Sequence, residues 1–321
     1  MKNYVLRRLI AAVPLVFAVV IFNFILIHAA PGDPVLLLTG EYTPTPELRA
    51  AIEEKFGLNK PLGEQILLYV GYILRGDLGE SIKFRRPVLT VIGERIGPTF
   101  LLMGISITMS IALGVLLGVA AARRPNSTID SLASSLSVFG WSIPIFWLAQ
   151  LLMIVFAVNL RMFPTTGMTS VKEPLIGLAQ VLDVMWHLFL PSLTIALLRT
   201  AQTFRLTRAS MLEVLGQDFI LTARSKGLSE RTTLFKHALK NAMRPIITMT
   251  GLQFGTMLAG ATMVEIVYSW PGMGRLIYEA AIARDYPLLM GVYFLSSLLV
   301  FVANLVTDIV HAFYDPRVRL E

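Results

Sequence analysis

Long apolar stretches recur along the chain and are separated by segments rich in charged and polar residues. A helix needs about 20 apolar residues to cross ~30 Å of hydrocarbon, and six stretches come close to that length. These stretches are residues 9–30, 98–122, 135–158, 188–207, 245–267 and 288–312. The pattern therefore predicts an all-α polytopic membrane protein with about six transmembrane helices.

The first stretch follows Lys2, Arg7 and Arg8, an arrangement that also begins a secretory signal peptide. The apolar part of a signal peptide is usually ~7 to 15 residues long, which is shorter than this stretch. In addition, His28 interrupts the small residues that a cleavage site before Ala30 would need. We therefore expect an uncleaved first span.

The composition agrees with a membrane protein, because 55% of the residues are hydrophobic and only 15% are charged. A soluble domain carries about 25% charged residues. Cysteine is absent, which excludes disulfide bonds, thiolate metal sites and a cysteine nucleophile. The net charge of +7 does not indicate nucleic acid binding here, because the basic residues are sorted between alternating connections.

This sorting predicts how the chain is oriented in the bilayer. The segments before the first stretch and after the second, fourth and sixth are basic, whereas the other connections are acidic or balanced. Lysine and arginine concentrate in the cytoplasmic loops of membrane proteins. We therefore expect both termini and the long basic loop at residues 208–244 to be cytoplasmic.

Residues 31–97, between the first two stretches, are expected to form a helical insert on the outer side. Three short amphipathic helices are predicted there, opened by Pro46, Pro61 and Pro87, and the third is expected to end at Arg95. Helices of this length are marginal alone, so they must pack on something. The insert is either a packed lid or a docking surface for a partner.

The connection between the fifth and sixth stretches contains a Trp-Pro-Gly-x-Gly turn beside tyrosines. Such a turn suits a re-entrant bend near the headgroups, where aromatic side chains are favoured and irregular backbone needs shielding from lipid. It is either a periplasmic gate or an anchor for the adjacent span. The residues concerned are Glu265, Trp270, Pro271 and Gly272.

Polar residues inside the apolar stretches are candidates for lining a solute path, because such residues are costly in lipid and usually face a cavity or the protein interior. The candidates are Ser142, Gln150, Arg199, Gln202 and Asn304. Small residues recur four apart at Gly114 and Gly118 and at Gly251 and Gly255, where they permit close helix packing. We expect that packing to be within the chain.

No phosphate-binding loop with its lysine and hydroxyl occurs, and neither a zinc-binding His-Glu-x-x-His pair nor a nucleophile elbow is present. The chain is therefore not expected to be an enzyme or to hydrolyse ATP itself. Asp308, His311 and Asp315 would share a helix face near the inner end of the last stretch. Such residues at an aqueous helix end are more often solvated or paired, so no metal site is expected.

The basic loop is patterned as a helix, a glycine and a second helix, which favours a docking element over a plain connector. Residues 222–228 read Thr-Ala-Arg-Ser-Lys-Gly-Leu, and residues 237–242 read His-Ala-Leu-Lys-Asn-Ala. Both segments resemble the coupling loop of ABC importer permeases, in the form usual for the dipeptide, oligopeptide and nickel branch. Further resemblances follow in order at residues 31–34, 76–81, 211–216, 269–275, 284–287 and 315–317.

The resemblance covers almost the whole chain and implies one permease domain over residues 1–321, similar to the first of the two permease subunits in such systems. It implies partners: a second homologous permease, two ATP-binding subunits that hold ATP and Mg²⁺, and an extracytoplasmic solute-binding protein. It implies no cofactor in this chain and a place in a bacterial or archaeal inner membrane. The residues assigned to ATPase coupling are Asp218, Ala223, Arg224, Lys226, Gly227, Leu228, Arg231, His237, Leu239 and Asn241.

Peptides are the expected solutes, with a nickel chelate, glutathione or an oligosaccharide as alternatives. A self-contained secondary transporter or channel is the main rival function, and an intramembrane enzyme is a more distant one. Secondary carriers often show repeats and broken helices around an ion site. No repeat between the two halves and no pair of intramembrane carboxylates is visible in the sequence.

Overall fold

The computed structural model describes residues 14, 17–25, 35–36, 44–56, 59–170, 175–255 and 262–314. Over these residues the protein is helical and contains no strand beyond one isolated antiparallel bridge between Glu80 and Pro87. The helices run in the order α3 (Pro46–Phe56), α4 (Leu62–Leu74), α5 (Val88–Arg123), α6 (Thr128–Ser142), α7 (Ile145–Leu152), η1 (Met153–Asn159), α8 (Leu178–Leu215), α9 (Asp218–Ser225), α10 (Glu230–Thr232), η2 (Thr233–Ala238), α11 (Leu239–Gly255), α12 (Thr262–Val267), α13 (Met273–Ile282) and α14 (Tyr286–Tyr314).

The two longest helices, α5 and α8, form the centre of the fold and run side by side. A Cβ added at Gly114 would lie 2.5 Å from the Cβ of Thr203, and one at Gly118 would lie 2.6 Å from that of Thr207. From the first contact to the second, the position advances by four residues on both helices, so α5 and α8 are parallel. Each glycine leaves room for a threonine of the other helix. The expected packing within the chain is confirmed for Gly114 and Gly118.

Three helices of the described part are long and apolar enough to cross a membrane: α5, α8 and residues 286–306 of α14. They confirm the second, fourth and sixth predicted spans. The third prediction, a single helix over 135–158, is wrong in form, because α6 and the α7–η1 helix meet at an angle of 108°. Pro144 imposes extended backbone on Ile143 (φ −81°, ψ 127°), and this separates the two helices.

The other two predicted spans lie partly outside the described residues. Residues 17–25 of the first stretch are helical, and the fifth stretch is represented by α11 and α12 on either side of residues 256–261. If the bent pair is counted as one broken span, the described residues contain up to four spans. The expected total of six is therefore tested only in part.

The insert helices open where the prolines predict, but the third does not end at Arg95. Instead, α5 continues through Pro98 to Arg123 as one helix of 36 residues. Buried side chains lie on both sides of the proline, at Ile92 and Met103, which are about three turns apart, so the same packed face continues across it. Prolines are tolerated in membrane helices where neighbouring groups satisfy the freed backbone.

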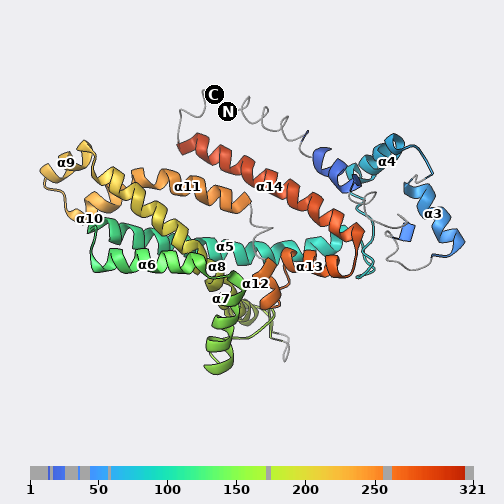
Figure 1. Ribbon diagram of the computed structural model, residues 1–321, viewed down its shortest axis with the longest axis horizontal. Coiled ribbons are helices and arrows are strands. Elements are labelled where there is room, and N and C mark those ends of the chain that lie inside the picture. Colours follow the sequence, from blue (N-terminus) through green and yellow to red (C-terminus); the bar gives the residue numbers. More distant parts are fainter. Residues whose placement is uncertain are drawn as a thin grey trace.

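Three apolar clusters hold the helices together at different levels. The middle cluster joins α5, α7 and α8 to α12. The outer cluster, which like the inner one is named for the predicted orientation of the chain, joins the start of α5 to α13 and α14. The inner cluster joins the ends of α5 and α8 to α9, η2 and α11. Figure 1 shows that α9 and α10 lie at one end of the molecule and α3 and α4 at the other.

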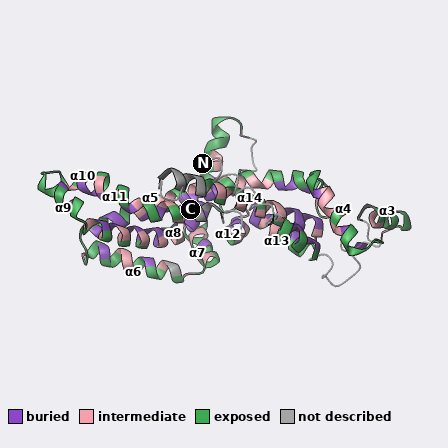
Figure 2. Ribbon diagram, turned by 90° about the horizontal axis from the view of Figure 1, so that it is seen from above, coloured by how far each residue is buried: buried purple, intermediate pink, exposed green. Residues whose placement is uncertain are grey.

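Exposed apolar side chains are numerous along the outside of the fold, as the green positions on α6 in Figure 2 illustrate. Examples on α6 and α8 are Leu132, Leu136, Phe139, Val181 and Trp186. A surface of this kind suits lipid or another membrane subunit.

Candidate functional site

The basic loop over residues 208–244, here called the coupling loop, folds into a compact helical hairpin. It consists of the end of α8, the short helix α9, a turn at Gly227, and the continuous run of α10, η2 and α11. Ser229 begins the second arm, because its hydroxyl oxygen accepts a hydrogen bond from the Thr232 N–H. The predicted helix-Gly-helix pattern is confirmed.

The turn at Gly227 ends α9 in a Schellman motif. The Gly227 N–H donates to the Arg224 carbonyl (2.9 Å), and the Leu228 N–H donates to the Ala223 carbonyl (3.4 Å). This pair of bonds requires a left-handed residue between the helix and its exit, and Gly227 has φ +75°. The glycine is therefore required by backbone conformation, since a Cβ there would meet no atom within 4 Å.

One face of the hairpin packs on the rest of the protein. Ile220, Leu234 and Ala238 are buried in the inner cluster with Met211 and Val214 of α8. Two of the residues assigned to coupling belong to this support: Ala223 is buried, and Leu239 packs against the cluster. Both side chains therefore help to attach the loop to the rest of the protein, and their role in coupling stays a prediction.

The opposite face exposes apolar side chains, which is unusual for a loop that would otherwise meet only water. Leu228 and Phe235 are 39% and 46% exposed, and Leu221 is 66% exposed. Phe219 is exposed as well. Leu221 and Phe219 were not among the expected contact residues; both are exposed on α9, on either side of the buried Ile220.

Charged groups surround this apolar face. The Arg224 guanidinium pairs with the Glu230 carboxylate across the turn (3.0 Å), so Arg224 links the two arms of the loop. Asp218, Lys226, Arg231 and Asn241 are exposed, and His237 is half-buried, with a carbonyl that accepts from the Asn241 side chain. The role of these residues in coupling stays a prediction.

Substitution of Gly227 by valine is expected to strain the Schellman motif by about 1–2 kcal/mol, because a β-branched residue disfavours positive φ. The hairpin should lose its geometry while the chain remains in the membrane. In an ABC importer of the kind that the resemblance implies, ATP hydrolysis by the complex should then no longer drive uptake. Gly227→Asn is the matched control, since asparagine tolerates this conformation. Uptake and hydrolysis measured on the same vesicles test this, and normal uptake by Gly227→Val would contradict it.

A second constellation lies at the level of the Trp-Pro-Gly turn and is here called the outer node. Glu265 on α12 is fully buried, and its carboxylate accepts hydrogen bonds from the Thr99 hydroxyl (2.8 Å) and the Arg275 N–H (2.9 Å). The Met273 N–H donates to the same Thr99 hydroxyl oxygen (2.8 Å). The carboxylate therefore accepts from a backbone N–H in the first turn of α13, where an anion is favoured, and links that turn to α5.

The tryptophan and glycines of the turn complete this node. Trp270 is fully buried, and its indole N–H donates to the Pro98 carbonyl on α5 (2.9 Å). A Cβ on Gly272 would overlap the Glu265 carboxylate, so the chain passes Glu265 too closely for any side chain. The node fastens the turn to α5. The role of the turn as an anchor or a gate stays a prediction.

An ion-pair group flanks α13 on its exposed side. The Glu279 carboxylate accepts from the Lys83 ammonium (3.0 Å) and from the Arg275 guanidinium (2.8 Å). Burial alone would raise the pKa of Glu279, but the hydrogen bonds and charges of Lys83 and Arg275 hold it below its ordinary value. The group links the segment before α5 to α13.

The five candidates for a solute path are spread over four helices. Ser142, Gln150 and Asn304 are exposed, on α6, α7 and α14. Arg199 and Gln202 are half-buried on α8, and Arg199 forms no ion pair with any residue that the structure describes. No described contact brings these five side chains together within the single chain, and their role stays a prediction.

The described residues contain no group of three or more histidine, aspartate or glutamate side chains that could hold a metal ion. The side chains of Asp308, His311 and Asp315 lie outside the described part of the structure. The metal question at that helix end is therefore untested.

Comparison with known proteins gives one consistent result. Residues 114–320 match the family described as the binding-protein-dependent transport system inner membrane component, and residues 1–102 match its N-terminal family. The oligopeptide transport system permease protein AppB of Bacillus subtilis is 38% identical over 99% of this chain and its own full length. The dipeptide permease DppB of Escherichia coli K12 is 36% identical over 99% of both chains.

Another curated relative and one solved structure agree. The glutathione transport system permease protein GsiC of Salmonella paratyphi A is 39% identical over 99% of both chains. An inward-facing structure of the MetNI methionine ABC transporter has a TM-score of 0.56 over 71% of this chain and 97% of that chain, at 16% identity, which shows a shared fold. The chain belongs to the family of inner-membrane components of binding-protein-dependent transport systems.

Proposed function

We propose that this chain forms half of the translocation pathway of an ATP-driven importer for peptides or similar small solutes. As a member of its family it is a membrane-spanning permease subunit of an ABC importer, not an enzyme. The observation that carries the proposal is the preformed coupling loop, with exposed apolar residues at one end of the fold. The relatives named for oligopeptides, dipeptides and glutathione share solutes that contain peptide bonds, and they favour peptides over nickel chelates or oligosaccharides.

The proposed assembly contains a second homologous permease, two ATP-binding subunits that hold ATP and Mg²⁺, and a solute-binding protein. The coupling loop would face the cytoplasm with both termini, as the distribution of basic residues supports. Closure of the ATP-binding subunits would move the hairpin as a body. Because Met211 and Val214 of α8 are buried against the hairpin, the motion would pass directly into a membrane-spanning helix.

The insert is the part of the chain that would contact the solute-binding protein, on the side of the membrane opposite the coupling loop. It is fastened to the membrane part through Tyr69 of α4, whose ring packs near that of Phe24 in the first span. Burial raises the pKa of the Tyr69 phenol to about 12, and its hydroxyl donates to the Met290 sulfur (3.7 Å).

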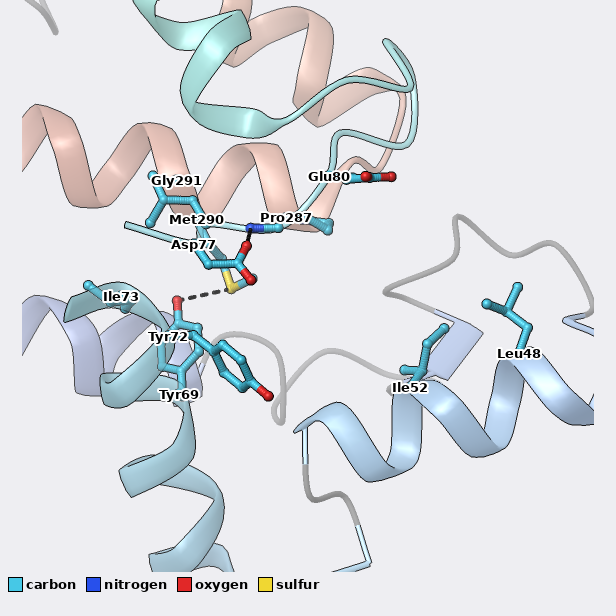
Figure 3. Close-up of a pocket in the computed structure, with 12 residues that line it drawn as sticks. Leu48, Ile52, Tyr69, Tyr72, Ile73, Asp77, Glu80, Pro287, Met290 and Gly291 are labelled. Atoms are coloured by element: carbon cyan, nitrogen blue, oxygen red, sulfur yellow. Dashed lines mark hydrogen bonds between the residues drawn. The ribbon is translucent and has the colours of Figure 1, made fainter. Parts of the chain in front are cut away.

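A cavity of about 300 Å³ opens between α3, α4 and the start of α14 (Figure 3). Its walls include Leu48 and Ile52 of α3, Tyr72 of α4 and Pro287 of α14. We expect part of this surface to become protected when the binding protein docks. Hydrogen exchange over residues 44–80, measured with and without that protein, tests the placement, and unchanged exchange would favour a simple lid.

Reconstitution of the chain with its partner subunits in lipid vesicles tests the proposed function. Hydrolysis of ATP should rise when the binding protein and a peptide are added together, and peptide should accumulate only with ATP. A secondary transporter would instead move solute through this chain alone, driven by an ion gradient and indifferent to ATP. That result would overturn the proposal.

A further inference from the structure

An ion pair joins α6 to α8 near the inner ends of the helices. The Arg208 guanidinium donates two hydrogen bonds to the Asp130 carboxylate, from Nε to Oδ1 (2.5 Å) and from a terminal nitrogen to Oδ2 (2.7 Å). The Asp130 side chain is only 4% exposed. A bidentate pair whose carboxylate is buried fixes the relative orientation of its two helices better than a fully exposed pair does.

Asp130 also organises the turn that leads from α5 into α6. Its Oδ2 accepts the N–H of Asn126 (2.9 Å), a residue with φ +62°. Its own N–H donates to the Ser127 hydroxyl oxygen that caps α6 (3.4 Å), and its Oδ1 accepts from Ser134 (3.3 Å). The carboxylate therefore holds the start of α6 and the preceding turn in one arrangement.

Apolar packing contributes little to the attachment of α6. Among the side chains of this helix that the structure describes, only Asp130 and Ser137 are buried, whereas Leu132, Leu136 and Phe139 are exposed. Hydrophobic burial normally supplies most of the attachment between helices. For α6, the ion pair between Asp130 and Arg208 is the specific contact that replaces hydrophobic burial.

The position of Arg208 connects this pair to the coupling loop. Thr207 packs against Gly118 of α5, and Met211, one helical turn after Arg208, lies in the inner cluster with Ile220 and Leu234 of the hairpin. The last turns of α8 therefore contact α9 and η2 of the hairpin on one side and α5 and α6 on the other.

We propose that Asp130 and Arg208 are positioning residues that make α6 follow the coupling loop. The inference rests on the proposed function, in which the ATP-binding subunits displace that loop. When the inner end of α8 moves, Arg208 carries the start of α6 with it, and the displacement reaches α7 beyond the bend at Pro144. Without the ion pair, α8 moves and α6 lags behind.

The test uses the full complex in vesicles and compares Asp130→Asn, Arg208→Gln and the exchanged pair Asp130→Arg with Arg208→Asp. Each single variant should still bind the ATP-binding subunits but transport less peptide per ATP, by roughly 2- to 30-fold, the range seen for mutations within coupling networks. The exchanged pair should recover much of the loss. Arg123→Gln, which removes a nearby exposed charge, is the matched control and should match the wild type.

A direct readout of α6 keeps the inference falsifiable if the exchanged pair folds poorly. The chain lacks cysteine, so Leu132→Cys provides its single site for a spin label. ATP should shift the label in the wild type and shift it much less in Asp130→Asn. Wild-type ratios in the single variants, or an unchanged label shift, would overturn the inference while leaving the proposed function intact, whereas failure of the wild type to bind the ATP-binding subunits would contradict the proposed function itself.

Discussion

Replacement of Leu228 by aspartate is expected to prevent the ATP-binding subunits from co-purifying with this chain. Leu228 directly follows Gly227 and is exposed, and the next arm of the hairpin carries the exposed Phe235. Buried apolar anchors supply most of the affinity of an interface, and an unpaired carboxylate enclosed by a partner costs several kcal/mol. Pull-down from detergent extracts measures the effect.

Two comparisons make this result specific. Leu228→Met keeps an apolar side chain of similar volume and should assemble normally. Lys226→Glu reverses an exposed charge at the rim and should weaken assembly only modestly. Arg224→Glu is less informative, because it would also place a carboxylate beside Glu230. Intact assembly with Leu228→Asp would mean that another face of the hairpin meets the partner.

Replacement of Gly272 by alanine is expected to disrupt the outer node and stop transport, although the ATP-binding subunits should still associate. The new Cβ would occupy the space of the Glu265 carboxylate. Overpacking of this kind costs about 1–3 kcal/mol. Displacement of the carboxylate would in addition leave the Arg275 N–H without its acceptor, at a cost of about 1–3 kcal/mol if that group remains buried.

Thermal unfolding of the purified complex and peptide uptake measure this effect. Gly104→Ala is the matched control, because Gly104 lies on α5 and a Cβ there would meet no atom within 4 Å. It should leave both quantities close to those of the wild type. Equal behaviour of Gly272→Ala and Gly104→Ala would show that the turn adapts and that the node does not constrain the outer ends of the helices.

Features encoded by local pattern were predictable from the sequence. The spans at α5, α8 and α14 follow from apolar length, and the Gly227 turn follows from a glycine between two helical patterns, so both were recovered. The break at Pro144 has an equally local signal, but the apolar residues on either side of it suggested one continuous helix. At Pro98 the opposite error arose, because a proline that neighbouring groups support does not end a helix.

The contacts of the functional sites were less predictable, because they join distant parts of the chain. Glu265 and Thr99 are separated by 166 positions, and Arg208 and Asp130 by 78. The sequence identifies Glu265 as a polar residue in an apolar setting, but not its partner. It likewise indicates that Arg224 is basic, whereas only the fold reveals that Glu230 already pairs with it.

The Schellman motif at Gly227 favours the affinity of the hairpin for a partner. A segment that must order itself on binding loses conformational entropy at that moment, which weakens its affinity. The hairpin instead closes its turn with its own backbone bonds and the Arg224–Glu230 pair before any partner arrives. Little of the interaction energy gained on docking is therefore spent on ordering the hairpin. The docked hairpin is stiff, and a stiff element can transmit a displacement between the partner and α8 in both directions.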